Sequence, residues 1–232
     1  MPFFYWFDWT YLVFIIPSII ISLVAQIKVK SAFNKYSKTP NLRGLTGEQA
    51  AQRVLDYNGV RGVRIERVKG KMTDHYDPKT NVIRLSEPVY DARTIASVSV
   101  AAHEAGHAVQ YANNYSPIKL RGAIFPLANI GSKLSWIFII VGIFLPVEYD
   151  FVIYIGIILF AFAVLFSIVT LPVEFDASKR ALNTIKAAAM LPENEYVGAK
   201  KVLSAAAMTY VAATFAAIMQ LLRLLAIVNR RD

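Results

Sequence analysis

The sequence predicts an α+β fold joined to several membrane-spanning helices, on the basis of three observations. Residues 28–122 are polar and basic, and they contain a helix pattern, three short strand patterns and a second helix, an order typical of α+β units. Long apolar stretches lie on both sides of this region. The second helix carries the sequence HEAGH at residues 103–107, which matches the metal-binding pattern H-E-x-x-H.

The composition favours a membrane protein. Hydrophobic residues make up 56% of the 232 residues, above the roughly 45–50% of soluble domains. The chain has no cysteine, which excludes disulfides, cysteine nucleophiles and thiolate ligands, so metal ligands must be His, Asp or Glu. The net charge of +9 is concentrated on particular segments, as at a membrane surface, and no aromatic-basic motif indicates a nucleic acid partner.

The first apolar stretch, residues 1–27, predicts an uncleaved transmembrane helix with its N-terminus outside. Lys28 and Lys30 follow the apolar residues instead of preceding them, unlike the charges of a signal peptide. Aromatic residues near the start resemble an interfacial belt, namely Tyr5, Trp6, Trp9 and Tyr11.

The basic region, residues 28–122, is expected to be cytoplasmic and to form the site. Thr46 and Gln49 predict a capping box for a short helix that ends near Asn58. Residues 63–68, 72–76 and 81–85 predict three strands separated by turn sequences. The second and third strands could form a hairpin whose free edge binds an extended peptide. An ordinary hairpin is the alternative.

The helix expected over residues 94–112 places His103 and His107 on one face, one turn apart. Two imidazoles in that position suit a single tetrahedral zinc ion, and Glu104 would lie where it can take a proton from bound water. A buried helix whose histidines satisfy polar neighbours is the alternative interpretation. His75, the third histidine, is expected to be a strand-end surface residue, with a catalytic role near the metal left open.

Residues 123–173 predict a transmembrane hairpin, with apolar runs at 124–147 and 151–173 around an acidic turn. Lys133 interrupts the first run and could reach toward an interface. The distribution of basic residues puts the acidic turn outside and the region of residues 28–122 inside.

The segment LPVEFDASKRA, residues 171–181, contains the candidates for a third metal ligand. Glu174 and Asp176 are two residues apart and cannot share a helix face, so at most one is expected to bind the metal directly. The other could support a ligating histidine. A solvated helix start with acidic residues is the alternative.

A helix over residues 174–201 is expected to be cytoplasmic, and residues 202–232 form a last apolar stretch interrupted by Gln220 and Arg223. Its length fits a fourth span. A span would place Arg230 and Arg231 outside, against the usual charge rule, so a helix packed on the folded region or lying in the interface is the alternative.

These residues resemble a known family, the YugP-like neutral zinc metallopeptidases of bacterial membranes, and are more distantly similar to HtpX-type and CAAX-prenyl membrane proteases. The resemblance rests on HEAGHAVQ, on LPVEFDASKRA and on the apolar hairpin between them. It implies a zincin-like catalytic domain in a bacterial plasma membrane, with a gluzincin-type site that holds one Zn²⁺. His103, His107 and Glu174 would be its ligands.

The same resemblance implies that Glu104 is the general base and that Arg180 is a candidate to stabilise the oxyanion. The distant relatives have an aspartate four residues after the ligating glutamate, where this chain has Ser178. Asp176 is a candidate for the supporting role that this aspartate would have.

The functional hypothesis is a membrane-integral zinc endopeptidase that cleaves polypeptides, including misfolded or membrane proteins, at the cytoplasmic membrane face. A site-2-type intramembrane protease is the second hypothesis, because the helix around His103 is itself apolar. The third is a non-enzymatic membrane scaffold with structural histidines.

Overall fold

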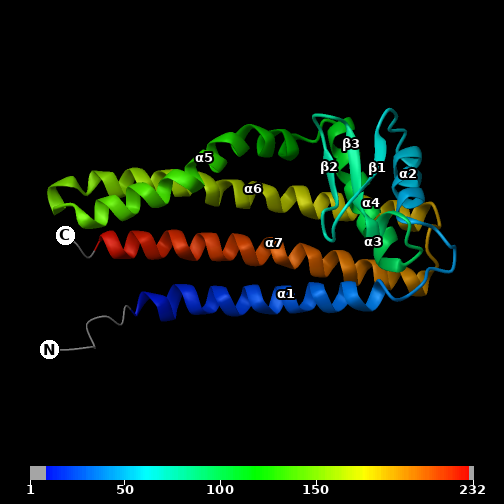
Figure 1. Ribbon diagram of the computed structural model, residues 1–232, viewed down its shortest axis with the longest axis horizontal. Helices are drawn as coiled ribbons and strands as arrows, with labels where there is room; N and C mark the ends of the chain where they lie inside the picture. Colours follow the sequence, from blue (N-terminus) through cyan, green and yellow to red (C-terminus); the bar gives the residue numbers. More distant parts are fainter. Residues whose placement is uncertain (1–8, 230–232) are drawn as a thin grey trace. The chain divides into compact units, whose positions relative to one another are not determined.

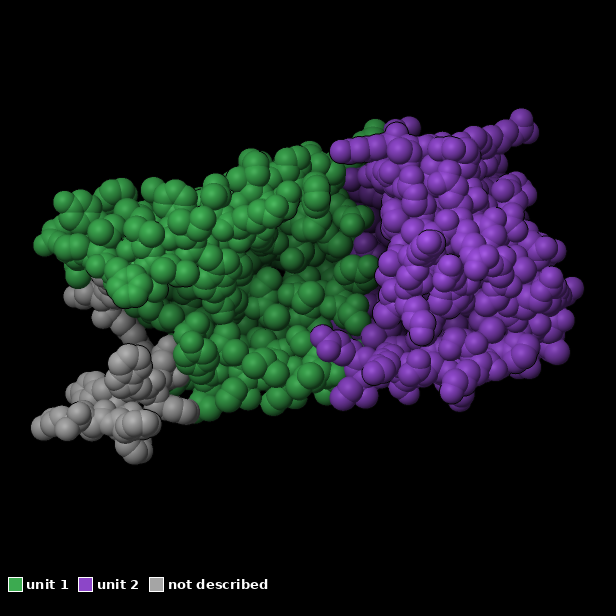
Figure 2. Space-filling model, viewed as in Figure 1, with its two compact units in different colours: residues 1–25, 119–171, 209–232 green, residues 26–118, 172–208 purple. Residues whose placement is uncertain are grey.

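The computed structural model describes residues 9–229, which are mostly helical with one small sheet (Figure 1). Tyr5, Trp6, Arg230 and Arg231 lie outside these residues, so the aromatic belt is described only at Trp9 and Tyr11. The chain forms two compact units (Figure 2). We call residues 1–25, 119–171 and 209–232 the helical unit, and residues 26–118 and 172–208 the mixed unit.

Four helical stretches within residues 9–229 are long and apolar enough to cross a membrane. The first combines a π-helical segment, Tyr11–Ile15, with α1, Ile16–Tyr36. The others are α5 (Ser116–Phe144), α6 (Phe151–Ala187, preceded by the 3₁₀ turn Val147–Tyr149) and α7 (Glu193–Val228). The last apolar stretch therefore has the length and composition of a fourth span.

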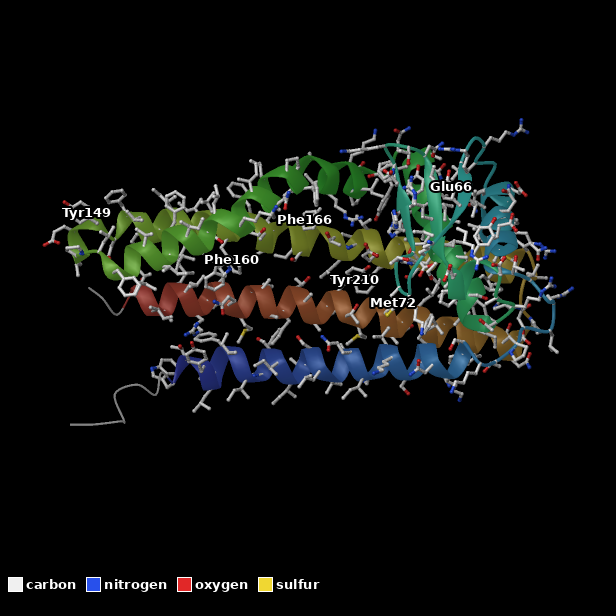
Figure 3. All side chains as sticks on the ribbon, in the orientation of Figure 1. Glu66, Met72, Tyr149, Phe160, Phe166 and Tyr210 are labelled. Carbon is white, nitrogen blue, oxygen red and sulfur yellow. The ribbon has the colours of Figure 1, made fainter. Side chains whose placement is uncertain are left out.

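In the helical unit, α5 and α6 form an antiparallel pair. Their backbones approach closely at Gly131, where a Cβ atom would lie 2.5 Å from the carbonyl oxygen of Leu159. Aromatic rings also meet between the two helices, Trp136 with Phe160 and Phe125 with Phe166. Phe160 and Phe166, on α6, are labelled in Figure 3. This packing accounts for the predicted hairpin, although α5 begins at Ser116, before the expected residue 123.

The end of α7 packs into the same unit. Leu224 and Val228 belong to an apolar cluster with residues of α5 and α6. Arg223, which interrupts the apolar run, lies over the ring of Tyr11 at 3.9 Å and donates a hydrogen bond to Thr10 Oγ1 at 3.2 Å. The charge of Arg223 is thus stabilised by a cation–π contact and a hydrogen bond, both with residues at the start of the first helical stretch.

In the mixed unit, two capped helices pack against each other. The predicted capping box of Thr46 and Gln49 is confirmed at the start of α2, Gly47–Tyr57. A second box, formed by Thr94 and Ser97, begins α4, Ile95–Ala112, between the short helix α3 (Glu87–Tyr90) and α5. Small and branched residues of α2 and α4 are buried together in the core. The helix predicted over residues 94–112 is confirmed as α4.

The sheet has the order β1-β3-β2, with strands Arg64–Val68, His75–Asp77 and Val82–Ser86 as β1, β2 and β3. β2 and β3 are antiparallel, as the hairpin prediction requires, whereas β1 is parallel to β3. β2 begins at residue 75 rather than 72. Gly70 and Met72 have φ of 107° and 59°, a left-handed conformation that interrupts the extended chain.

The long helices α6 and α7 differ from the predicted segments. α6 continues through Pro172 to Ala187, so no break separates the apolar run from the residues around Glu174. α7 likewise passes through residue 201 without interruption. Proline removes one backbone donor, and apolar membrane helices tolerate this loss. The alternative interpretation of a solvated helix start does not hold at Glu174, because this residue lies inside α6 and is 3% exposed.

Candidate metal centre

Two helices of the mixed unit bring together three possible metal ligands. His103 and His107 lie on one face of α4, with ring centroids 4.8 Å apart. Glu174 reaches them from α6, and its Oε2 atom lies 3.3 Å from His103 Nε2 and 3.5 Å from His107 Nε2. The donor atoms all lie within 4.8 Å of one another, and no other such group occurs within residues 9–229.

The donor set fits a zinc ion in its chemistry and in the two distances from Glu174 to the imidazoles. Two imidazoles and one carboxylate are typical ligands of catalytic zinc sites, where a water or substrate takes the fourth position. Zinc–ligand bonds of about 2.0–2.1 Å in a tetrahedron place neighbouring ligand atoms about 3.3–3.4 Å apart. The two distances from Glu174 to the imidazoles, 3.3 and 3.5 Å, agree with this spacing.

Gly106 allows the two helices to approach this closely. It lies between the two histidines, and a Cβ atom at this position would lie 2.6 Å from the carbonyl oxygen of Ala177 on α6. Real Cβ atoms essentially never come so near to a backbone oxygen. The glycine of the HEAGH sequence therefore has a packing role that spacing arguments do not reveal.

Hydrogen bonds orient the two imidazoles. His103 Nδ1 lies 3.1 Å from Ser178 Oγ, and His107 Nδ1 lies 3.0 Å from Gln110 Oε1. With both Nδ1 atoms engaged, both Nε2 atoms face Glu174 and are available as ligands. Ser178, four residues after Glu174, thus contacts one of the candidate ligands, His103.

Sequence reasoning assigned no role to Gln110, which is fully buried. Its Nε2 atom donates to the backbone oxygen of Val173 at 2.8 Å and to Asp176 Oδ2 at 2.9 Å. Because these partners accept hydrogen bonds, the amide must turn Oε1 toward His107. The only signal in the sequence is the i,i+3 spacing of Gln110 from His107, which places the two on neighbouring turns.

Asp176 and Arg180 lie behind the donor cluster. Asp176 is not part of the cluster and accepts hydrogen bonds from Gln110 and from Arg180 Nε. The guanidinium of Arg180 also lies over the ring of Tyr115, at 5.5 Å. Asp176 therefore supports His107 through Gln110 and is not placed to replace Glu174 as a ligand.

His75 lies at the start of β2, where its side chain is exposed and Nδ1 faces the backbone oxygen of Thr73 at 2.7 Å. It is absent from the donor cluster of the described residues, in agreement with a strand-end surface position. A catalytic role for His75 stays a prediction.

Glu104 is half-buried beside the two histidines. Within residues 9–229, no group is hydrogen-bonded to its carboxylate. Burial opposes the charged form of His107, but the hydrogen bond that His107 donates to Glu174 and the charges of Glu104 and Glu174 outweigh this effect and raise the pKa of His107. The two carboxylates thus make the site favourable for a cation.

Comparison with known proteins agrees with this geometry. Residues 11–229 match the family described as "Putative neutral zinc metallopeptidase". The chain belongs to this family. It is also 48% identical over 213 residues to the "Putative membrane protease YugP" of Bacillus subtilis (strain 168), which covers 91% of this chain and 94% of that protein. No solved structure matches the chain significantly.

This family is the one that the sequence motifs resemble. Membership of it implies that the metal is zinc. Within residues 9–229, His103, His107 and Glu174 form a possible site for this metal. The apolar helices also agree with the description of the Bacillus relative as a membrane protein.

Proposed function

We propose that the protein is a membrane-integral, zinc-dependent endopeptidase. The observation that carries this proposal is the arrangement of three buried or half-buried donors with a fourth, uncommitted carboxylate beside them. His103, His107 and Glu174 would hold the metal, and Glu104 would remain for proton transfer. A site that only binds metal has no need for this second carboxylate.

Zinc bound here would polarise the scissile carbonyl and increase the acidity of a bound water. Glu104 accepts the proton of the attacking water and delivers it to the leaving amine. Ser178 and Gln110 keep the imidazoles in the orientation that exposes Nε2. The contacts of Arg180 with Asp176 and Tyr115 favour a positioning role over direct stabilisation of the oxyanion.

The substrate polypeptide would bind in an extended form along β2. In the sheet of the described residues, β2 pairs only with β3, so its other edge offers unpaired backbone groups. An extended peptide can add to such an edge through main-chain hydrogen bonds. This mode depends little on substrate sequence and suits the cleavage of misfolded or membrane polypeptides.

We place the site on the cytoplasmic side of a bacterial plasma membrane. Lys28 and Lys30 follow the first apolar stretch, whereas the turn between α5 and α6 contains Glu148 and Asp150. Basic residues favour the cytoplasmic side of spanning helices.

An intramembrane protease of the site-2 type is less well supported. α4 is not among the four helices of residues 9–229 that are long and apolar enough to span a membrane. It instead packs on α2 and on the sheet through a shared core, as in a folded unit outside the bilayer. A non-enzymatic scaffold would leave the Glu104 carboxylate without a role.

The test combines metal content with cleavage of an unfolded protein by the detergent-purified chain. We expect about one zinc per wild-type chain, loss of zinc in Glu174→Ala, and retained zinc in Glu104→Gln. Glu104→Gln should reduce cleavage at least about 100-fold, because general acid–base catalysis contributes about 10²–10⁴-fold.

Glu148→Gln, in the turn between α5 and α6, is the matched control and should resemble wild type in both measurements. A Glu104→Gln variant as active as wild type would remove Glu104 from the mechanism. Zinc-loaded wild type that cleaves no unfolded protein or peptide library would favour the scaffold.

A further inference from the structure

The two imidazoles of the metal centre have chemically different partners on the side that faces away from Glu174. His107 Nδ1 lies 3.0 Å from the amide oxygen of Gln110, and the same amide donates to Asp176 Oδ2 at 2.9 Å. A carboxylate therefore stands behind the partner of His107. His103 Nδ1 lies 3.1 Å from the hydroxyl oxygen of Ser178, which has no other hydrogen-bond partner within residues 9–229.

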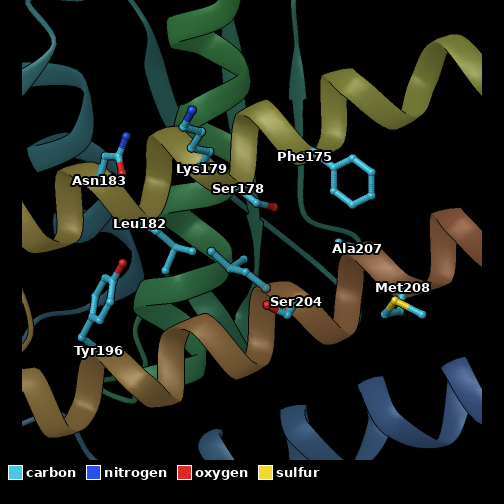
Figure 4. Close-up of a pocket in the computed structure, with 10 residues that line it drawn as sticks. Phe175, Ser178, Lys179, Leu182, Asn183, Tyr196, Ser204, Ala207 and Met208 are labelled. Atoms are coloured by element: carbon cyan, nitrogen blue, oxygen red, sulfur yellow. The ribbon is translucent and has the colours of Figure 1, made fainter.

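The surroundings of these two partners differ as well. Gln110 is fully buried, so its hydrogen bonds are protected from water. Ser178 is half-buried and lines a pocket of about 400 Å³ between α6 and α7 that is open to solvent (Figure 4). Water in this pocket can compete for the hydroxyl, and a hydrogen bond that water can replace contributes little net free energy.

This difference bears on how strongly each imidazole binds a metal. With Nε2 as the ligand atom, Nδ1 carries the proton, and an acceptor for that proton raises the basicity of the ligand. An amide oxygen whose NH₂ group donates to a carboxylate is polarised by that bond and is a stronger acceptor than a lone hydroxyl. His103 should therefore be the weaker of the two imidazole ligands.

We propose that Ser178 makes His103 the labile ligand of the centre, so that the protein takes up and releases zinc reversibly and its activity follows the supply of free zinc. This regulation rests on the proposed peptidase function, because it acts through the same metal. Ser178 is a positioning residue in this role, since it acts through His103 and does not touch the reacting atoms.

Ser178→Asp is the first test. The aspartate keeps the Cβ atom, places a carboxylate beside His103 Nδ1, and has room for its second oxygen in the open pocket. We expect zinc affinity to rise about 10- to 100-fold, the range over which partners of metal-bound histidines change affinity. Zinc release to an excess of chelator, followed by stopped-flow absorbance, should slow correspondingly.

Asn183→Asp is the matched control. Asn183 is exposed on α6 and lines the same pocket, but it has no hydrogen bond to His103. The substitution adds the same charge as Ser178→Asp, and solvent screens it, so zinc affinity should stay within about twofold of wild type. Equal tightening in both aspartate variants would trace the effect to charge alone and overturn the role of Ser178.

Ser178→Ala provides a second test that requires no new group to fit. Because water in the pocket can replace the hydroxyl, the loss of zinc affinity should be at most about threefold, below the 10- to 100-fold that a full partner of a metal-bound histidine contributes. A loss as large as that of Gln110→Ala would show that Ser178 holds His103 firmly, and would overturn the proposal. Unchanged affinity in Ser178→Asp would overturn it as well.

Measurements of binding and of cleavage separate this regulation from the peptidase function. In zinc buffers, wild type should reach half of its maximal cleavage of an unfolded protein at a free zinc concentration at least about 10-fold higher than Ser178→Asp requires. Tighter zinc binding by Ser178→Asp without cleavage by any variant would keep the labile ligand and overturn the peptidase. Cleavage by both proteins with the same dependence on free zinc would keep the peptidase and overturn the labile ligand.

Discussion

The side-chain amide of Gln110 has three partners, and they fix its orientation. Two acceptors hold Nε2, and the third partner is His107 Nδ1. We expect Gln110→Ala to weaken zinc binding about 10- to 100-fold, because residues that orient metal-bound histidines contribute this much to affinity. Competition with a chromogenic chelator measures the zinc affinity of each variant. The measurement is made at a temperature at which circular dichroism shows that the variant is folded.

Gln52→Ala is the control for this substitution. Gln52 lies exposed on α2, where its amide donates to Asp56 Oδ1, and it touches no residue of the metal site. Its zinc affinity should equal that of wild type. If Gln110→Ala also binds zinc as tightly as wild type, the orientation of His107 does not depend on this hydrogen bond.

At the scale of elements, the close approach of α4 and α6 at Gly106 determines whether Glu174 can reach the histidines. Gly106→Ala would force a Cβ atom against the carbonyl oxygen of Ala177 and separate the helices. We expect a loss of about 1–3 kcal/mol in the free energy of unfolding, as in other overpacked sites, together with weaker zinc binding. Thermal unfolding and zinc content measure the two effects.

Gly122→Ala, inside α5, provides the comparison. A Cβ atom there meets nothing within 4 Å, so the substitution adds a better helix former without a clash. It should leave stability unchanged or raise it slightly. Equal stability and zinc content in the two alanine variants would show that the helices can adjust at Gly106.

Elements that depend on local signals could be predicted from the sequence, and those that depend on tertiary contacts could not. Side-chain caps and apolar spacing give α2 and α4 within a residue or two of their observed ends. The predicted boundary between residues 173 and 174 does not exist, because α6 continues from its apolar part into its polar part without a break, even though Pro172 lies inside it. The strand predicted over residues 72–76 begins only at His75, because Met72 has a left-handed backbone that its residue type does not indicate.

The same distinction applies to the site. The i,i+4 spacing of His103 and His107 predicts their shared face, and the sequence limits the candidate partners from α6 to Glu174 and Asp176, of which Glu174 lies in the donor cluster. The choice between those two carboxylates, the part played by Gln110, and the pocket beside Ser178 depend on how α4, α6 and α7 pack. None of these contacts is local in the sequence.

At the scale of the whole molecule, the sidedness of the chain can be measured directly, because it contains no cysteine. Single cysteines at Met72, Glu148 and Asn229 would report the loop before β2, the turn between α5 and α6, and the end of α7. With four spanning helices, a membrane-impermeant maleimide should label Glu148→Cys and Asn229→Cys in intact cells. Met72→Cys, at a residue that is 74% exposed, should react only after permeabilisation.

The cysteine-free chain gives the background, and each variant should first retain wild-type zinc content. The contact of Arg223 with Tyr11 places the end of α7 beside the start of the first helical stretch, so Asn229 and the N-terminal end should lie on one side of the membrane. Labelling of Asn229→Cys only after permeabilisation would mean that α7 does not span. Labelling of Met72→Cys in intact cells would place the metal centre outside, where its substrates would be extracytoplasmic polypeptides.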